Sequence, residues 1–405
     1  LTIDNLTQDN VLNAKEAGSD QLISGSSTAQ AGQTVTVSLN GETYQTTVDA
    51  QGHWQVKVPA ADLQALSDGQ ITVSASVADK AGNSIEATHN VQVDLQAPVI
   101  TVDRVAGDDV INVTEHGQAQ VITGSATGGE AGNRVVVTLA GNTYNTVLDA
   151  SGHWSVGVPA SVIAALQDGN VTIAVTVTDS AGNVGSASHD IKVDTGLPTL
   201  SINTIAGDDI INSTEKGQDL TITGQATGLA SGVTVTVSLN GHQYTATVDD
   251  KGNWSTVVPA ADVATLGEAV YSVSASATNE VGNNISTVHA ITVGTQTPLV
   301  IINTVAGDDV INASELAAGQ TLSGKVSGAA AGDTVTVHLG GNTYTATVAN
   351  DLTWSVKVSS DDLTAMGNGA LAIDASVTNK TGNTGQATHA ISIDANLPGL
   401  RVDTV

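Results

Sequence analysis

Acidic and amide side chains recur in short loops of this chain, at spacings that could hold a cation. One segment reads Ala-Gly-Asp108-Asp109-Val-Ile-Asn112, and Glu115 follows three residues later. Side chains at these spacings present hard oxygen donors on a turn. Ca²⁺ accepts about six to eight such donors in a flexible geometry, whereas Mg²⁺ prefers a rigid octahedron and keeps its waters. The segment therefore favours calcium among the oxygen-bound cations.

Two further acidic clusters accompany this segment. Asp94 and Asp103 flank Pro98, and a hairpin loop reads Asp179-Ser-Ala-Gly-Asn183. Asp and Asn also favour turns for local reasons, so one such loop on its own is better explained as a solvated turn. Clustered carboxylates repel one another unless a cation is present. Because all three clusters recur together, in a chain with 40 acidic and 12 basic residues, we expect calcium sites.

The predicted calcium ligands share a place in one of these three clusters or in their copies along the chain. They are Asp9, Glu16, Asp79, Asp94, Asp103, Asp108, Asp109, Asn112, Glu115, Asp179, Asn183, Asp194, Asp208, Asp209, Asn212, Glu215, Asp308, Asp309, Asn312, Glu315, Asp394 and Asp403.

Composition excludes several classes of protein. The formal net charge of −28 excludes a nucleic-acid binder that works by phosphate neutralisation. Since the chain has no cysteine, it has no disulfide, thiolate metal site or cysteine nucleophile. No apolar run reaches the length of a membrane span, so no membrane insertion is expected in this segment. Neither G-x-S-x-G nor HExxH nor a phosphate-binding loop occurs, and we expect no enzymatic activity.

The clusters are carried by a long internal repeat. The four tryptophans, Trp54, Trp154, Trp254 and Trp354, are spaced by 100 residues. A fixed period indicates an array of units, and a unit of this size can bury its own core. We predict Ig-like repeats at 1–97, 98–197, 198–297 and 298–397, and the start of a fifth at 398–405; they are called repeats 1 to 4 below.

Within repeat 2, alternation of apolar and polar residues predicts seven short strands. Glycine and asparagine separate them, and only residues 159–166 read as a short helix. The predicted fold is all-β: four tandem immunoglobulin-like, seven-stranded Greek-key sandwiches in an elongated array. Trp154 shares the inward parity of Val156 and Val158, so it should be a core anchor rather than a sugar-stacking platform. His189 should be a structural residue at the sheet rim, with a metal ligand or pH-sensitive contact as the alternative.

Two arrangements could bring the acids together where one repeat meets the next. In the first, the opening turn of one repeat, the linker pair and the hairpin of the next repeat converge. For repeats 1 and 2 this set is Asp9, Glu16, Asp94, Asp103 and Asp179. In the second, residues 106–115 fold back and contribute Asp108, Asp109 and Glu115 instead.

One joint should differ from the others under either arrangement. Near residues 294–303 the linker acids are replaced by Gly294 and Asn303, and the hairpin acid by Asn279 or Asn379. We predict that this joint binds fewer ions, or binds them more weakly, and is a hinge.

These motifs resemble the bacterial Ig-like repeats of giant, type I-secreted RTX-type adhesins and biofilm-associated proteins of Gram-negative bacteria. The resemblance covers all four repeats. It departs at Gln8-Asp9-Asn10, which replaces Gly-Asp-Asp, at Gly294, and at Leu352 and Ser359, which replace a turn glycine and a proline. The motifs that carry it are AGDDVIN, which reads AGDDIIN in repeat 3, with its following Glu (106–115, 206–215, 306–315), G-x-T-Y (141–144, 341–344), G-H-W (52–54, 152–154), VPAADL (58–63), D-x-A-G-N (79–83, 179–183) and V-D-T-x-x-P (193–198).

The resemblance implies an extracellular stalk at the bacterial cell surface, stiffened by Ca²⁺, that carries a distal binding region for cell adhesion and biofilm formation. Its partners would then be the neighbouring repeats of the same chain. The alternative is that the repeats themselves bind a glycan or self-associate between cells.

Overall fold

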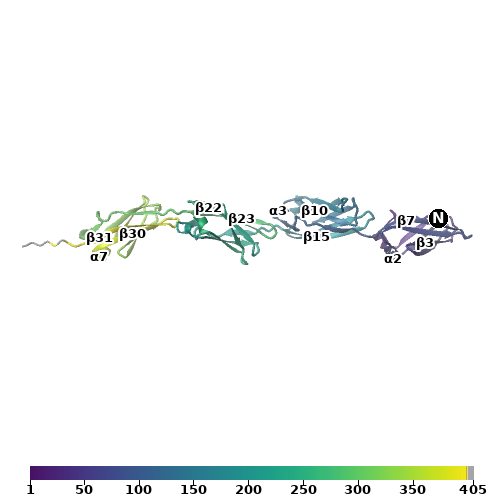
Figure 1. Cartoon of the computed structure of the whole chain (residues 1–405), viewed down its shortest axis with the longest axis horizontal. Helices are drawn as coiled ribbons and strands as arrows, with labels where there is room; N and C mark the ends of the chain where they lie inside the picture. The colour runs from purple at the N-terminus through teal and green to yellow at the C-terminus, as the bar shows by residue number, and fades with distance from the viewer. Residues whose placement is uncertain (398, 400–405) are drawn as a thin grey trace, which may run out of the picture. The chain divides into compact units, whose positions relative to one another are not determined.

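The computed structural model describes residues 1–397 and 399, which fold into four β-sandwiches (Figure 1). Each sandwich pairs a five-stranded sheet with a smaller sheet of two or three strands. The chain divides into two compact units, Leu1–Gly196 and Leu197–Val405, and each unit contains two sandwiches. The predicted fifth repeat at 398–405, including Asp403, lies outside the described residues apart from Gly399.

Repeat 2 shows the plan of a sandwich. One sheet has the order β12-β11-β14-β15-β9 and the other has the order β13-β10-β8. The elements are β8 (Val99–Val102), β9 (Val110–Asn112), α3 (Val113–His116), β10 (Gln120–Thr127), β11 (Arg134–Leu139), β12 (Asn142–Val147), β13 (His153–Val158), α4 (Ala160–Ile163), β14 (Gly169–Thr178) and β15 (Val184–Asp194).

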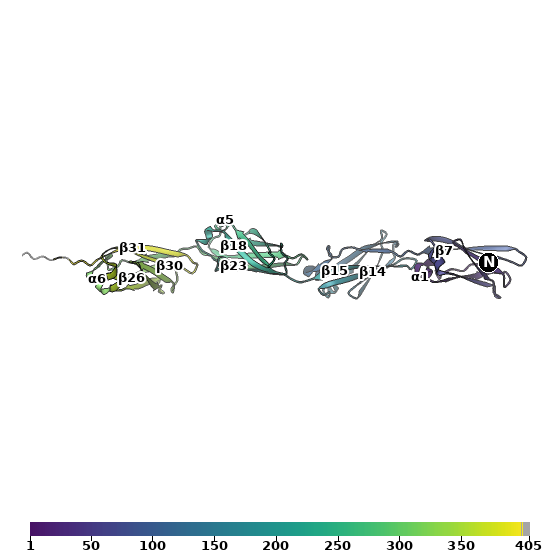
Figure 2. The same ribbon diagram turned by 90° about the horizontal axis from the view of Figure 1, so that it is seen from below.

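The all-β sandwich fold is confirmed, with one strand more than the sequence predicts. All seven predicted strands are present, and β14 and β15 lie side by side as an antiparallel hairpin (Figure 2). The additional strand, β9, has three residues and pairs in parallel with the end of β15. It escapes prediction because it is too short to show alternation and lies inside the acidic segment. The predicted helix at 159–166 begins after Pro159 as expected but is shorter.

The other repeats follow the same plan. In repeat 1 the first strand is replaced by two backbone hydrogen bonds, from Thr2 to Ser26 and from Asp4 to Ser24. Its elements are β1 (Val11–Asn13), α1 (Ala14–Ala17), β2 (Gln21–Ser26), β3 (Thr34–Leu39), β4 (Glu42–Thr47), β5 (His53–Val58), α2 (Ala60–Gln64), β6 (Gly69–Ala78) and β7 (Ser84–Asp94).

The elements of repeat 3 are β16 (Thr199–Ile202), β17 (Ile210–Ile211), η1 (Glu215–Gly217), β18 (Leu220–Thr227), β19 (Thr234–Leu239), β20 (His242–Thr247), β21 (Asn253–Val258), α5 (Ala260–Val263), β22 (Ala269–Thr278) and β23 (Asn284–Val293). Those of repeat 4 are β24 (Leu299–Ile302), β25 (Val310–Asn312), α6 (Ala313–Ala318), β26 (Gln320–Ser327), β27 (Thr334–Leu339), β28 (Asn342–Thr347), β29 (Thr353–Val358), α7 (Ser360–Met366), β30 (Gly369–Thr378) and β31 (Thr384–Asp394).

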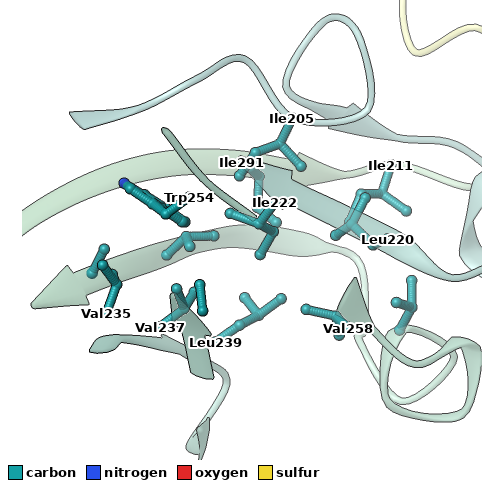
Figure 3. Packing of buried hydrophobic residues seen from close by; sticks show 14 of the residues in the cluster. Ile205, Ile211, Leu220, Ile222, Val235, Val237, Leu239, Trp254, Val258 and Ile291 are labelled. Carbon is teal, nitrogen blue, oxygen red and sulfur yellow. The ribbon is translucent and has the colours of Figure 1, made fainter. Parts of the chain in front are cut away.

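Each repeat has its own hydrophobic core around its tryptophan. In repeat 3 the Trp254 ring packs between the sheets near Ile222 and Ile291 (Figure 3). All four tryptophans are no more than 3% exposed, which confirms that they face inward. A glycine opposite each ring makes room for it: a side chain at Gly124 would collide with Trp154 and the Thr101 carbonyl. The tryptophans therefore belong to the core and do not form a binding platform.

No helix in residues 1–397 is long and apolar enough to cross a membrane.

Candidate metal centre

The joint between repeats 1 and 2 is built by three segments. The opening turn of repeat 1, after β1, lies at the end of β7, where Asn13 is in register with Asp94. The hairpin of repeat 2, between β14 and β15, contacts this turn. The Ala14 amide donates to Asn183 Oδ1 at 2.8 Å, and Asn13 Nδ2 donates to the Ala181 carbonyl at 3.0 Å. Asn183 Nδ2 donates to the Asp94 carbonyl at 3.0 Å. Direct hydrogen bonds thus connect the two repeats.

Carboxylates gather beside these hydrogen bonds. Burial raises the pKa of Asp94, and the charges of Asp179, Asp68 and Glu130 raise it further. These neighbours come from both repeats: Asp68 accepts from the Leu95 amide, and Glu130 accepts from the Ser180 hydroxyl. The joint therefore concentrates negative charge around a half-buried carboxyl group.

Asp179 organises the hairpin that presents it. Its Oδ1 accepts from the amides of Ala181 and Asn183, at 3.0 and 2.8 Å, and its Oδ2 accepts from Asn183 Nδ2 at 3.0 Å. Asp179 is only 7% exposed and Asn183 only 4%. These bonds hold both side chains at the joint and leave further lone pairs on the carboxylate.

The chemistry of this group fits an oxygen-bound cation. The donors are hard oxygens that repel one another, and such groups bind Ca²⁺ together with backbone carbonyls and water. In the described part of the chain, however, no three His, Asp or Glu side chains already stand in a metal-binding cluster. Asp94 and Asp179 would be the central ligands, and carbonyl groups and water would complete the shell.

In repeats 1, 2 and 4 the Asn-x-x-Glu pairs of the acidic segments cap short helices. In repeat 2, Asn112 Oδ1 accepts from the amides of Thr114 and Glu115, and Glu115 Oε2 accepts from the Asn112 amide. This reciprocal capping box satisfies the free amides at a helix start. The same bonds occur in Asn13 and Glu16, Asn212 and Glu215, and Asn312 and Glu315. Through them the opening turn of repeat 1 holds the shape that meets Asn183.

The Asp pairs of these segments lie along the sandwich rather than at its end. Asp109 Oδ1 accepts from the Val105 amide and lies 2.7 Å from His189 Nε2, in the middle of β15. Asp209 and Asp309 bind His289 and His389 in the same way, at 2.7 Å each. In repeat 1 the partner of His89 is the neutral Asn10. His189 thus contacts a carboxylate of its own repeat from the middle of β15, a contact that fits both a structural role and a pH-sensitive one.

The remaining predicted ligands are separate from the joint. Asp103 accepts from the Thr123 hydroxyl; it lies five residues along an extended strand from Pro98, roughly 15 Å away. Asp9 accepts from Thr7 and the Val11 amide. The amide two residues further along donates to each of Asp108, Asp208 and Asp308. Asp79 accepts from the Ala81 amide within its own hairpin. Asp194 binds Lys192, and Asp394 binds Asn396.

The structure thus brings together part of the first predicted arrangement, with the opening turn, Asp94 and Asp179, but without Asp9 and Asp103. Sequence reasoning missed Asp68 and Glu130. Asp68 recurs as Asp168 and Glu268 but stands alone rather than in an acidic cluster, and Glu130 has no acidic counterpart in the other repeats.

The chain was compared with known proteins. The profile of the bacterial Ig-like domain matches residues 4–95 and 106–195. A solved structure described as "Ca2+-stabilized adhesin helps an Antarctic bacterium reach out and bind ice" is 37% identical, over 97% of this chain and 98% of that one, with a TM-score of 0.41. Another, "Structural insight into host cell surface retention of a 1.5-MDa bacterial ice-binding adhesin", is 34% identical over 73% and 97%, with a TM-score of 0.42.

A third solved structure, "Crystal structure of tetra-tandem repeat in extending region of large adhesion protein", is 25% identical over 97% and 98%, with a TM-score of 0.39. No curated protein matches the chain. The relationship rests on the profile match and on sequence identity over nearly the full length, and the same plan of strands continues through repeats 3 and 4. The chain belongs to the bacterial Ig-like domain family, as a tandem array similar to the repeats of large adhesion proteins.

Proposed function

We propose that this chain is a calcium-rigidified extender of a large bacterial surface adhesin, which holds a distal binding region away from the cell. The observation that carries the proposal is the group of carboxylates around Asp94, contributed by both repeats at one joint. A cation there would replace repulsion with attraction between the repeats. The description of a similar protein as Ca²⁺-stabilized supports the choice of ion.

The expected affinity explains how such a rod would be used. Extracellular calcium modules bind at about 10⁻⁴ to 10⁻³ M. The joint would therefore be occupied outside the cell and empty in a calcium-poor cytoplasm, which suits export of an unfolded chain by type I secretion. Because the ion binds the assembled joint, it stabilises that state by mass action. The role proposed is mechanical rather than catalytic, and it serves adhesion and biofilm formation at the cell surface.

The proposal is tested by hydrogen exchange and X-ray scattering on the full chain, in millimolar calcium and in chelator. We expect the Ala14 amide, which donates to Asn183, to exchange more slowly in calcium. The scattering profile should change from a rod in calcium to flexibly linked beads in chelator. Identical hydrogen exchange and identical scattering in both buffers would mean that the acidic residues lie in solvated turns and bind no calcium. Association that grows with protein concentration would instead favour homotypic contact between copies.

A further inference from the structure

The joint between repeats 3 and 4 follows the same path as the joint between repeats 1 and 2 but lacks its charges. Gly294 stands in place of Asp94, Asn379 in place of Asp179, and Ala330 in place of Glu130. Only Glu268 remains, at the position of Asp68, and it accepts from the Thr295 amide and hydroxyl. A calcium centre of the kind proposed for the first joint cannot be built from these residues.

We infer that this second joint is a calcium-independent lock, in which Gly294, Asn379 and Thr381 replace the proposed ion beside the buried contact of Asn383. The contrast with the first joint rests on the proposed function, but the lock itself rests on direct contacts. It also replaces the hinge that the sequence alone predicts for residues 294–303.

The first part of the lock is a buried amide. Asn383 is 2% exposed, and its Oδ1 accepts from the Ser213 amide of repeat 3 at 2.8 Å. Its Nδ2 donates to the Gly294 carbonyl at 2.6 Å and to Thr381 Oγ1 at 2.8 Å. One buried side chain thus joins the opening turn of repeat 3, the linker and the hairpin of repeat 4. Removing a buried partner leaves polar groups unsatisfied, so this contact resists opening.

The second part is a close fit between Gly294 and Thr381. A Cβ atom at Gly294 would lie 2.8 Å from Thr381 Cγ2, which is closer than real side chains approach. In the first joint the hairpin residue at this position is Ala181, and the linker residue is Asp94. The first joint therefore has a large linker residue and a small hairpin residue, whereas the second joint has a small linker residue and a larger hairpin residue. The side chain of Thr381 occupies space that a linker aspartate would need.

The third part replaces the hairpin acid. Asn379 Oδ1 accepts from the Thr381 hydroxyl at 2.8 Å and from the Asn383 amide at 3.0 Å. Its Nδ2 donates to the Gln296 carbonyl of the linker at 2.9 Å. An aspartate cannot donate this bond, because an ionised carboxylate only accepts. Asn379 therefore binds directly to the linker, where Asp179 would need a cation.

The test measures the distance across each joint in the full chain. Since the chain has no cysteine, pairs of introduced cysteines can be spin-labelled without background. Gln55 and Ser155 span the first joint, and Ser255 and Ser355 span the second; all four are exposed at equivalent positions beside the tryptophans. Double electron–electron resonance then gives a distance distribution for each pair of spin labels, in calcium and in chelator.

We expect the distribution for the second pair to stay narrow in both buffers, and that for the first pair to lose its narrow peak in chelator. Broad distributions for the second pair in both buffers would restore the hinge and overturn the lock. A distance distribution of the second pair that is narrow only in calcium would overturn the lock in favour of an ion site. A distance distribution of the first pair that is the same in calcium and in chelator would contradict the proposed function and leave the lock standing.

A pair of variants tests the contact itself. Gly294→Ala should broaden the second distribution in both buffers, because the added methyl meets Thr381 Cγ2. Adding Thr381→Ser removes that methyl, keeps the hydroxyl and should restore the narrow distribution. Gly157→Ala is the control, since a Cβ there meets nothing within 4 Å. Failure of the double variant to recover, with both repeats folded, would overturn the assignment of this contact to the lock.

Discussion

The joint between repeats 1 and 2 has the same backbone path as the joint between repeats 3 and 4, but different side chains surround it. Both use a buried hairpin asparagine, Asn183 or Asn383, that accepts from an amide of the preceding repeat and donates to the linker carbonyl. Around that common element the first joint collects carboxylates, whereas the second has Gly294, Asn379 and Thr381. The asparagine contact is thus the constant part, and the charges are an addition to it.

This difference teaches that an acidic motif near a joint does not by itself predict an ion. Asp208, Asp209 and Glu215 stand close in sequence to the opening turn of repeat 3, as their counterparts do in repeat 2, yet their oxygens serve their own loop. What separates the joints is the linker residue, two residues of the hairpin and the replacement of Glu130 by Ala330. Four changes test this comparison, in order of expected effect.

The largest effect should come from a second feature that both joints share, the close approach of a glycine in the last strand to the carbonyl of the linker proline. A side chain at Gly185 or Gly385 would collide with the carbonyl of Pro98 or Pro298, where the linker lies against the hairpin. Gly185→Ala and Gly385→Ala should each destabilise their repeat by about 1–3 kcal/mol, the usual range for overpacking. Chemical denaturation measures the change, with Gly157→Ala as the control. Unequal effects would show that the linkers are held differently and would weaken the comparison.

The next change makes the first joint resemble the second. Asp179→Asn removes one charge from the group around Asp94, so calcium should bind there about tenfold more weakly, or about 1.4 kcal/mol. Asp79→Asn is the matched control, because Asp79 makes the same bonds in the hairpin of repeat 1. Isothermal titration compares the two. Equal calcium binding by both variants would exclude Asp179 from the site.

The pH dependence of the first joint should depend on calcium. Because the folded-state pKa of Asp94 is raised, its ionised form destabilises the joint when no cation is present. In chelator, lowering the pH toward the ordinary carboxyl pKa of 3.8 should therefore slow exchange of the Ala14 amide beyond the intrinsic effect of pH. With calcium bound the sign should reverse, since protons compete with the ion. The second joint, with Gly294 at this position, should show neither trend.

The smallest effect concerns the contacts between histidine and aspartate along the sandwiches, away from the joints. Hydrogen bonds from the Ile205 amide and from His289 lower the pKa of Asp209. Its contribution to stability is present above the ordinary carboxyl pKa and is lost as the pH falls through the lowered value. Asp209→Asn, which copies the natural Asn10 of repeat 1, should remove this acid dependence at a cost below about 1 kcal/mol. Thermal unfolding between about pH 5 and pH 3 measures it, and an unchanged pH profile would contradict it.

Much of the fold could be predicted because the pattern recurs and the strands alternate. The 100-residue spacing of tryptophan identified the repeat, and the parity of Trp154 placed its ring in the core. The short parallel strand β9 could not be predicted, because three residues carry no periodic signal. The capping boxes were visible as Asn-x-x-Glu, but the same residue types suit a cation, and sequence alone does not separate the two.

The candidate site was only partly predictable, for a reason that lies in the topology. Asp94 and Asp179 belong to recurring motifs and were found. Asp68 reaches Asp94 through the fold of repeat 1, where it accepts from the Leu95 amide, and Glu130 reaches it from a loop of repeat 2. The role of Thr381 depends on the absence of a side chain at Gly294, and neither residue draws attention by its type. A contact defined by complementary sizes appears only when both partners are placed.

The parallel pairing of β9 with β15 has a consequence for a chain under tension. β9 lies near the start of repeat 2 and β15 ends it, and the two strands run in the same direction. A pull on the two ends of the repeat therefore drives these strands past each other lengthwise. This pull loads the ladder from Val110 to Asn112 in shear, together with the 2.8 Å bond from the Lys192 amide to the Asp109 carbonyl beside it. In shear all of these bonds carry the load at once, whereas in unzipping they would break one after another. A strand of three residues would thus resist the separation of the two ends of the repeat.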